Sequence, residues 1–246
     1  MKLLQLIRSL LAVPFALFLT LLISLITLFW TLVLRRDAAS VQGLASWWAR
    51  TISSFCGVTV TVAGTENLDP DKPYIFAANH QSQFDIFALQ GFLGVDFRWL
   101  AKKELFQVPI WGPAMRKAGY IPVDRSHGRQ ALKSLDEAAR KIVAGTSVII
   151  FPEGTRSKDG KLHEFKAGAM VLAIKSGVDI VPVAIKGTYE ILPKGKLLMN
   201  AGEVSILVGN PIATKSYTTR DKHALAQILH DDVAHLLNTL ASQPDD

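Results

Sequence analysis

Hydrophobic residues are concentrated at the start of the chain, where the 25 residues from Leu10 to Leu34 include no charged side chain. As an α-helix this segment is about 38 Å long, which exceeds the ~30 Å hydrocarbon core of a bilayer. A cleaved signal peptide is the alternative, but its apolar region is shorter and a small-residue cleavage site follows it. We predict a retained membrane-associated helix whose orientation stays open, because basic residues flank both ends.

A second helix is predicted for residues 41–57, which include the adjacent Trp47 and Trp48. Tryptophans beside a membrane segment suit the interface between lipid and water, and packing against a following domain explains them almost as well. The charge of Arg50 argues against a second crossing of the membrane. Residues 1–57 are therefore predicted to form N-terminal membrane-anchoring helices.

From residue 58 onward, short apolar segments alternate with segments of helical periodicity. Continuous apolar or β-branched runs predict strands, and apolar residues spaced three or four apart predict helices. Strands are expected at 58–62, 74–78, 97–101, 147–151, 180–185 and 204–208, and helices at 84–92, 131–143, 167–175 and 224–240. This alternation predicts a single α/β domain over residues 58–246, with a mixed or parallel, largely buried sheet flanked by helices.

The net charge of +6 is unevenly distributed along the chain. Residues 1–36 hold four basic and no acidic groups, and the rest holds 23 basic and 21 acidic groups, which argues against a nucleic-acid-binding domain. Residues 95–166 hold 14 basic and eight acidic groups. This local excess favours an anionic ligand or an anionic membrane surface, and an ordinary solvated surface is the simpler alternative.

The first candidate chemical motif runs from Asn79 to Asp85. His80 follows a predicted strand and precedes a predicted helix, where α/β proteins often place reactive groups. If the chain turns there, the Asp85 carboxylate fixes one imidazole nitrogen and the other nitrogen can take a proton from a substrate hydroxyl. A histidine and an aspartate at this spacing also occur by chance, so the pair alone is a weak signal.

The second motif is the hexapeptide Phe-Pro-Glu-Gly-Thr-Arg at residues 151–156. Pro152 ends a predicted strand, and Gly154 permits a tight turn whose backbone N–H groups can face an anion. Arg156 can bind a phosphate through two parallel hydrogen bonds. Glu153 can bind a hydroxyl or hold Arg156. A structural Glu–Arg pair beside a turn is the alternative.

Further cations precede this hexapeptide, namely Lys102, Lys103 and Arg125. Arg125 ends the segment 119–125 and is a candidate second phosphate ligand, although an ion pair with Asp124 explains it equally well. The chain has one cysteine, Cys56, and its histidines are scattered, so no set has the spacing of metal ligands. Neither a metal nor a resident cofactor is predicted.

Taken in order, these segments resemble the glycerolipid acyltransferase family, which includes 1-acylglycerol-3-phosphate acyltransferases. Four ordered blocks carry the resemblance: 79–85 with its His-x4-Asp, 119–125 ending in Arg, 151–156, and 181–185 with Val-Pro-Val. The resemblance covers roughly residues 58–210. It departs from the family at Asp179, where many members have Pro, and at Asn200-Ala201, where many have Pro-Gly.

The resemblance implies that His80 is a general base oriented by Asp85. It implies that the glycerol hydroxyl of a lysophospholipid attacks an acyl thioester directly, with no acyl-enzyme. The residues implied in binding the phosphorylated acceptor are Lys103, Arg125, Glu153, Gly154, Thr155 and Arg156.

The implied reaction transfers an acyl chain from acyl-CoA or acyl-carrier protein to the sn-2 hydroxyl of lysophosphatidate, giving phosphatidate. Another acceptor, such as lyso-ornithine lipid or another lysophospholipid, is the alternative within this class. A lipid hydrolase or transacylase and a non-catalytic lipid-binding protein are the alternatives outside it. Expected partners are membrane lipids, lysophosphatidate and the thioester donor, and no nucleic acid. The expected location is a cell inner membrane, with the catalytic domain facing the cytoplasm.

Overall fold

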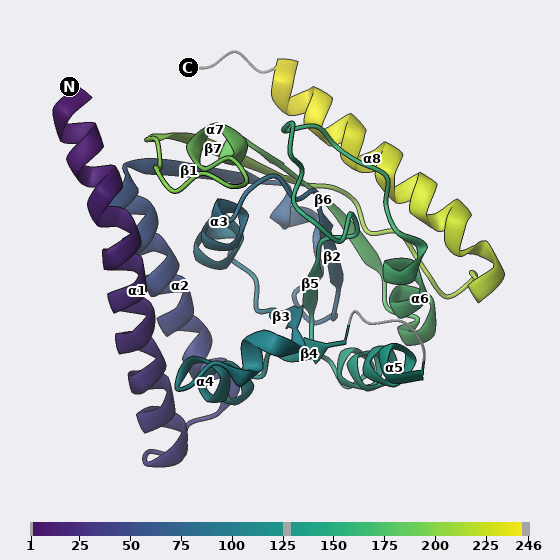
Figure 1. Cartoon of the computed structure of the whole chain (residues 1–246). Helices are drawn as coiled ribbons and strands as arrows, with labels where there is room; N and C mark the ends of the chain where they lie inside the picture. Colours follow the sequence, from purple (N-terminus) through teal and green to yellow (C-terminus); the bar gives the residue numbers. More distant parts are fainter. Residues whose placement is uncertain (1, 125–128, 243–246) are drawn as a thin grey trace.

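The computed structural model describes residues 2–124 and 129–242. Two long helices open the chain, α1 (Lys2–Leu32) and α2 (Ala38–Cys56), and they pack side by side (Figure 1). The Asp37 side chain caps α2 by accepting a hydrogen bond from the Ser40 N–H. Gly57 ends α2 at a φ of 69°, a left-handed conformation that glycine adopts without steric cost.

Seven strands in the described residues form one mixed sheet in the order β1-β7-β6-β2-β5-β3-β4. Neighbouring strands are parallel except β6 and β7, which run antiparallel. Central strands are buried on both faces, whereas burial alternates along the edge strand β1. The strands are β1 Val58–Ala63, β2 Ile75–Ala78, β3 Arg98–Lys102, β4 Ile121–Val123, β5 Val148–Ile150, β6 Ile180–Lys186 and β7 Gly202–Val208.

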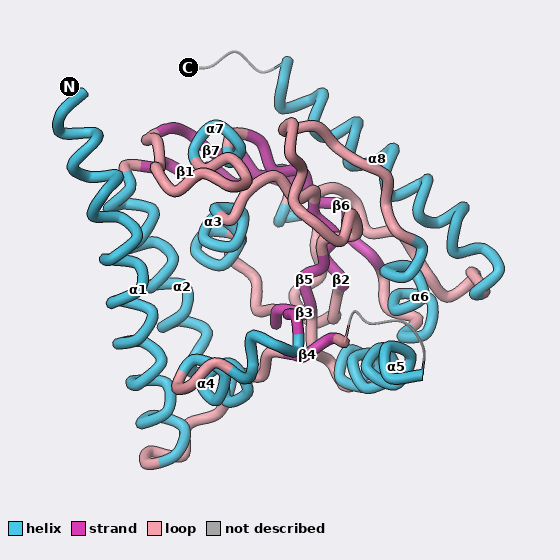
Figure 2. The backbone as a smooth tube through the Cα atoms, viewed as in Figure 1, coloured by secondary structure: helices cyan, strands magenta, loops and turns pink. Residues whose placement is uncertain are grey.

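Helices cover both faces of this sheet (Figures 1 and 2). One cluster of buried side chains joins α1, α2 and α3 to one face, and a second joins α5, α6 and α8 to the other. The further helices are α3 Phe84–Phe92, α4 Trp111–Lys117, α5 Arg129–Val143, α6 Ala167–Ser176, α7 Thr188–Ile191 and α8 Lys222–Ser242. Short 3₁₀ turns occupy Thr65–Asn67, Lys103–Gln107 and Thr219–Asp221.

The predicted α/β architecture with a mixed, buried sheet is confirmed, and each strand and helix predicted from residue 41 onward appears within a few residues of its expected bounds. The first helix, expected over Leu10–Leu34, begins eight residues earlier, at Lys2. Three elements were not predicted: α4, β4 and α7. They contain seven, three and four residues, too few for a hydrophobic period to stand out. The sequence also predicts a helix cap at Ser126 and a frayed polar tail at residues 243–246, and both lie outside the described residues.

The α1 helix is the one helix among the described residues that is long and apolar enough to cross a membrane. Only 28% of its most apolar part is buried in the protein. Its inner side packs on α2 and α4, while large apolar side chains such as Leu17 and Phe18 are exposed. The cluster of buried side chains that includes Ala12 and Leu19 continues into the sheet. The division of the chain into N-terminal helices and a catalytic domain between residues 57 and 58 stays a prediction.

Candidate active site

His80 lies in the loop between the buried strand β2 and helix α3. The preceding residue, Asn79, is fully buried and joins this loop to β6. Its side-chain amide donates to the Ile185 carbonyl at 2.9 Å, and its carbonyl oxygen accepts from the Ile185 N–H at 2.7 Å. The start of the loop is therefore fixed to the centre of the sheet.

The Asp85 carboxylate folds back onto His80 from the first turn of α3, as the sequence predicts. The distance from His80 Nδ1 to Asp85 Oδ2 is 2.7 Å, and Asp85 is fully buried. Backbone N–H groups of Gln81 and Ser82 donate to the same oxygen at 2.8 and 3.0 Å. The Thr188 hydroxyl donates to Oδ1 at 2.5 Å. With Nδ1 held as the donor, Nε2 is the basic nitrogen of the ring.

The two motifs predicted from the sequence meet at His80. The imidazole stacks on the Phe151 ring with the centroids 3.8 Å apart and the planes 9° from parallel. The His80 N–H donates to Glu153 Oε1 at 2.6 Å, and the His80 carbonyl accepts from the Ser157 N–H at 2.7 Å. Segments separated by about seventy positions thus form one rigid unit.

Glu153 is turned into the protein rather than toward Arg156. One carboxylate oxygen accepts from the backbone of His80, and the other accepts from the His163 N–H at 3.3 Å. Burial raises the pKa of the Glu153 carboxyl above its usual value, and the two backbone hydrogen bonds oppose that shift. The carboxylate therefore joins three loop segments, and the expected Glu153–Arg156 contact is replaced by these backbone contacts.

Residues 151–154 form the predicted tight turn, and Thr155 and Arg156 follow it. Gly154 has a φ of 73°, and its N–H donates to the Phe151 carbonyl at 3.0 Å. Lys194, from the loop after α7, donates to the Thr155 hydroxyl at 3.0 Å and to the Arg156 carbonyl at 2.9 Å. The ammonium group of Lys194 therefore stabilises the turn that presents Arg156.

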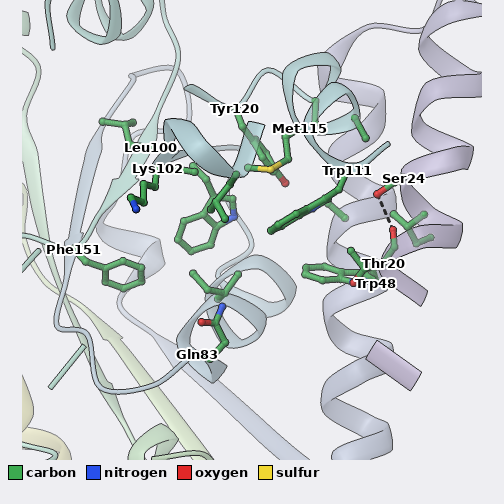
Figure 3. A pocket seen from close by; sticks show the side chains of 18 of the residues that line it. Thr20, Ser24, Trp48, Gln83, Leu100, Lys102, Trp111, Met115, Tyr120 and Phe151 are labelled. Carbon is green, nitrogen blue, oxygen red and sulfur yellow. Dashed lines mark hydrogen bonds between the residues drawn. The ribbon is translucent and has the colours of Figure 1, made fainter. Parts of the chain in front are cut away.

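An apolar cavity of about 440 Å³ extends from His80 to the N-terminal helices. Figure 3 shows Trp48 and Trp111 between Phe151 on one side and the labelled residues of α1 on the other. Thr20, Ile23 and Ser24 of α1 line the far end, where the Ser24 hydroxyl donates to the Thr20 carbonyl at 2.7 Å. Such a space suits a hydrocarbon chain.

Arg156 stands between this cavity and a second, more open hollow of about 930 Å³. The hollow carries several charged side chains of both signs, and its cations outnumber its acidic groups by one. Its charged lining residues are Glu153, Arg156, Lys158, Asp159, Glu164, Lys166 and Lys194. An apolar chain and a charged group of one lipid can therefore lie on the two sides of Arg156.

The two neighbouring lysines that the sequence suggested as phosphate-binding cations have different surroundings in the structure. Lys103 forms an ion pair with Asp124 at 2.6 Å, whereas Lys102 lines the apolar cavity. Arg125 lies outside the described residues. Within residues 2–124 and 129–242, no group of three or more His, Cys, Asp or Glu side chains is arranged to hold a metal ion.

Three side chains beside the site were not singled out from the sequence. Thr188 binds the Asp85 carboxylate, Lys194 binds the turn at 155–156, and Phe151 stacks on His80. Thr188 lies 103 positions from Asp85. It directly follows the Val-Pro-Val block and Gly187, but no local pattern marks a threonine as the partner of a distant carboxylate.

Comparisons with known proteins agree on one family. The sequence profile described as Acyltransferase matches residues 59–186. The chain is 39% identical over 171 residues to a chloroplast 1-acyl-sn-glycerol-3-phosphate acyltransferase of Arabidopsis thaliana, covering 69% of this chain and 48% of the relative. It is 33% identical over 204 residues to the enzyme of that name from Limnanthes douglasii, covering 82% of this chain and 69% of the relative.

A solved structure is also similar over nearly the whole chain. It is the crystal structure of the 1-acyl-sn-glycerophosphate acyltransferase PlsC from Thermotoga maritima, with a TM-score of 0.84 and 29% identity. The match covers 98% of this chain and 100% of that one. By contrast, the chain spans about half the length of the first chloroplast relatives that it matches.

Proposed function

This chain belongs to the acyltransferase family, and on that premise we propose that it transfers an acyl chain from a thioester to lysophosphatidate, giving phosphatidate. The observation that carries the proposal is the His80–Asp85 pair, which stands between an apolar cavity and the turn that presents Arg156. The names of the relatives quoted above support this choice of acceptor and product.

In the proposed reaction His80 acts as the general base. The hydroxyl oxygen of the acceptor forms a bond with the thioester carbonyl carbon while its proton moves to Nε2. Asp85 stabilises the imidazolium through Nδ1. The carbon–sulfur bond then breaks, and the proton passes from His80 to the departing thiolate. The products are the ester and a free thiol, and His80 returns to its neutral form.

The acceptor phosphate is proposed to bind at Arg156. The guanidinium suits bidentate binding of phosphate. The Gly154 N–H is held by the Phe151 carbonyl, and Lys194 holds the Thr155 hydroxyl and the Arg156 carbonyl. Lys102 lines the cavity nearby and is the better placed of the two lysines to assist. Arg125 stays a predicted second ligand, and Glu153 is assigned to positioning His80 and the turn.

We place the protein at the cytoplasmic face of a cell inner membrane. The exposed apolar side of α1 supports contact with lipid, and its packing along α2 and α4 favours an arrangement in the plane of one leaflet. A lipid acceptor can then reach the cavity from that leaflet, because residues of α1 and α2 form part of the cavity wall.

The test is acyl transfer by the purified full chain in detergent or liposomes. Acyl-CoA and acyl-carrier protein are offered separately as donors. Lysophosphatidate, lyso-ornithine lipid and lysophosphatidylcholine are compared as acceptors. We expect lysophosphatidate to be preferred, and Arg156→Ala to weaken the use of this acceptor more than that of acceptors without a phosphate monoester.

Two histidine variants test the base. His80→Ala is expected to lower the turnover number by about 10²–10⁴-fold or more while the far-ultraviolet circular dichroism stays unchanged. His235→Ala, the same substitution at an exposed position of α8, is the matched control. Near-normal turnover in His80→Ala would reject the mechanism, and activity confined to another lysolipid would reject the acceptor.

A further inference from the structure

The loop between α7 and β7 presents two leucines to the outside. Leu197 is 75% exposed and Leu198 is 50% exposed, and Lys194 and Lys196 precede them in the sequence. Leu197 has the highest exposed fraction of the large hydrophobic side chains that the structure describes. Neither leucine belongs to the cavity wall or to either cluster of buried side chains.

The base of this loop is firmly anchored, so the exposure belongs to a defined conformation. The Asn200 N–H donates to the Ile191 carbonyl at 2.9 Å, which closes the loop at its ends. Pro193 forms a bridge with Ser82, and the Lys196 N–H donates to the Pro193 carbonyl at 3.0 Å. The leucines therefore follow a hydrogen-bonded turn inside a loop that is closed at its ends.

The same loop lies against the first turns of α1. The Ser9 hydroxyl donates to the Met199 carbonyl, and the Met199 and Cys56 sulfur atoms are 3.5 Å apart. Figure 1 shows the loop beside α7 reaching the N-terminal part of α1. Leu6, Ile7 and Leu10 of α1, within one turn of Ser9, are 46%, 46% and 58% exposed.

We propose that Leu197 and Leu198 form a second membrane contact, which inserts into an anionic lipid surface beside α1. This inference rests on the proposed function, because it takes the exposed side of α1 to be in contact with lipid. Two observations select a lipid surface over a protein partner. The leucines directly precede Met199, which contacts Ser9 beside exposed apolar side chains of α1, and Lys196 supplies a cation for acidic head groups.

This contact connects the membrane to the proposed phosphate site through a short stretch of chain. Lys194 lies three residues before Leu197 in the same loop. Its ammonium group donates to the Thr155 hydroxyl and to the Arg156 carbonyl. A loop seated in the head-group layer therefore keeps Arg156 at the depth of the acceptor phosphate. The inserted leucines fix the height of the active site above the bilayer, a role that α1 alone does not provide.

The test uses an environment-sensitive fluorophore on a single introduced cysteine in the full chain. The three variants are Leu197→Cys at the loop, Leu17→Cys on the exposed side of α1 and Val143→Cys at the end of α5. Val143 is a matched control, because it is 62% exposed but belongs to the opposite side of the sheet. The native Cys56 is 2% exposed and burial raises the pKa of its thiol to about 11, so the unmodified protein serves as the labelling blank.

Vesicles contain phosphatidylcholine alone or with phosphatidylglycerol, and brominated lipid tails report contact by quenching. On anionic vesicles we expect the label at Leu197 to shift to the blue and to be quenched several-fold more than the label at Val143. Adding Lys196→Glu should lower quenching at Leu197 several-fold and leave quenching at Leu17 unchanged.

The two proposals fail in different ways. Quenching at Leu17 with none at Leu197 would overturn the loop contact and leave the membrane location standing. Absence of quenching at both positions would overturn the membrane location and the loop contact together. Equal quenching at Leu197 on neutral and anionic vesicles would overturn the preference for an anionic surface.

Discussion

The environment of the Asp85 carboxylate explains how a buried charge is kept beside His80. Two backbone N–H groups and the imidazole share one oxygen, and the Thr188 hydroxyl binds the other. Burying a carboxylate without such partners is costly. The loop conformation at 81–82 and the position of α7 are therefore part of the catalytic arrangement.

Removing the Thr188 hydroxyl should impair both stability and catalysis. We expect Thr188→Ala to lower the free energy of unfolding by about 1–3 kcal/mol, because one buried carboxylate oxygen loses its partner. The turnover number should fall, since the carboxylate is free to rotate away from Nδ1. Thr188→Ser keeps the hydroxyl and should restore turnover. Thermal unfolding and steady-state kinetics of both variants provide the measurement. Equal turnover in both variants would show that the Thr188 hydroxyl does not position the Asp85 carboxylate for catalysis.

Gly154 offers a second prediction at this scale, since its positive φ and its neighbours both oppose a side chain. A Cβ there would lie 2.9 Å from the Lys166 ammonium nitrogen. Gly145 also has a positive φ, of 100°, but open space around it. Gly154→Ala and Gly145→Ala should each destabilise the fold by about 1–2 kcal/mol through backbone strain.

Only Gly154→Ala should also raise the KM for lysophosphatidate, because the turn that presents Arg156 must shift. Michaelis constants and melting temperatures of the two variants are compared under the same conditions. An unchanged KM in Gly154→Ala, with the expected loss of stability, would show that the turn takes no part in binding the acceptor.

At the scale of elements, the apolar cavity depends on helices that lie outside the sheet. Residues of α1 and α2 close its far end, and α4 contributes Trp111, Ala114 and Met115. His80 lies in the loop between β2 and α3, and Asp85 lies in the first turn of α3. The N-terminal helices therefore shape the cavity beside this pair, in addition to the membrane contact proposed for them.

A larger side chain in the wall of the cavity should shorten the acyl chain that the protein accepts. Ala45 of α2 lines the cavity, whereas Ala12 of α1 is buried in the hydrophobic cluster beneath α1 and does not line the cavity. Ala45→Leu and Ala12→Leu should each cost about 1–3 kcal/mol through overpacking. Only Ala45→Leu should shift the preference toward shorter acyl thioesters. Competition among thioesters of different chain length measures this preference. A shift of similar size in both variants would contradict the proposal that Ala45 lines the space for the acyl chain.

For the whole molecule, the proposed contact with the bilayer depends on the exposed side of α1. α1 packs along α2 and α4 with its inner side and leaves Leu17 and Phe18 more than 60% exposed. A helix covered on one side by the protein presents only the other side to lipid, which favours binding to one leaflet over crossing.

Charge on that side should therefore release the protein from membranes. We expect Leu17→Asp combined with Phe18→Asp to move a several-fold larger fraction of the protein into the soluble phase, with melting temperature preserved. Val143→Asp, at an equally exposed position on α5, should leave the distribution unchanged. Membrane fractionation measures the distribution, and retention of the doubly charged variant in the membrane would indicate a spanning helix.

The sequence by itself determined the elements and the two chemical motifs of this protein. Apolar runs and helical periods located every described strand except β4 and every described α-helix except the short α4 and α7, because these signals depend on neighbouring residues alone. The approach of Asp85 to His80 was also predictable, since five positions across a loop and a helix start bring them together.

Tertiary structure alone decided the strand order, the antiparallel pairing of β6 with β7, and the contacts of Thr188, Lys194 and Glu153. It also placed Lys102 rather than Lys103 in the cavity wall, because Asp124 of a neighbouring segment pairs with Lys103. These contacts join residues tens of positions apart, and each depends on how the sheet and its helices pack together. A local pattern of residues does not predict that packing.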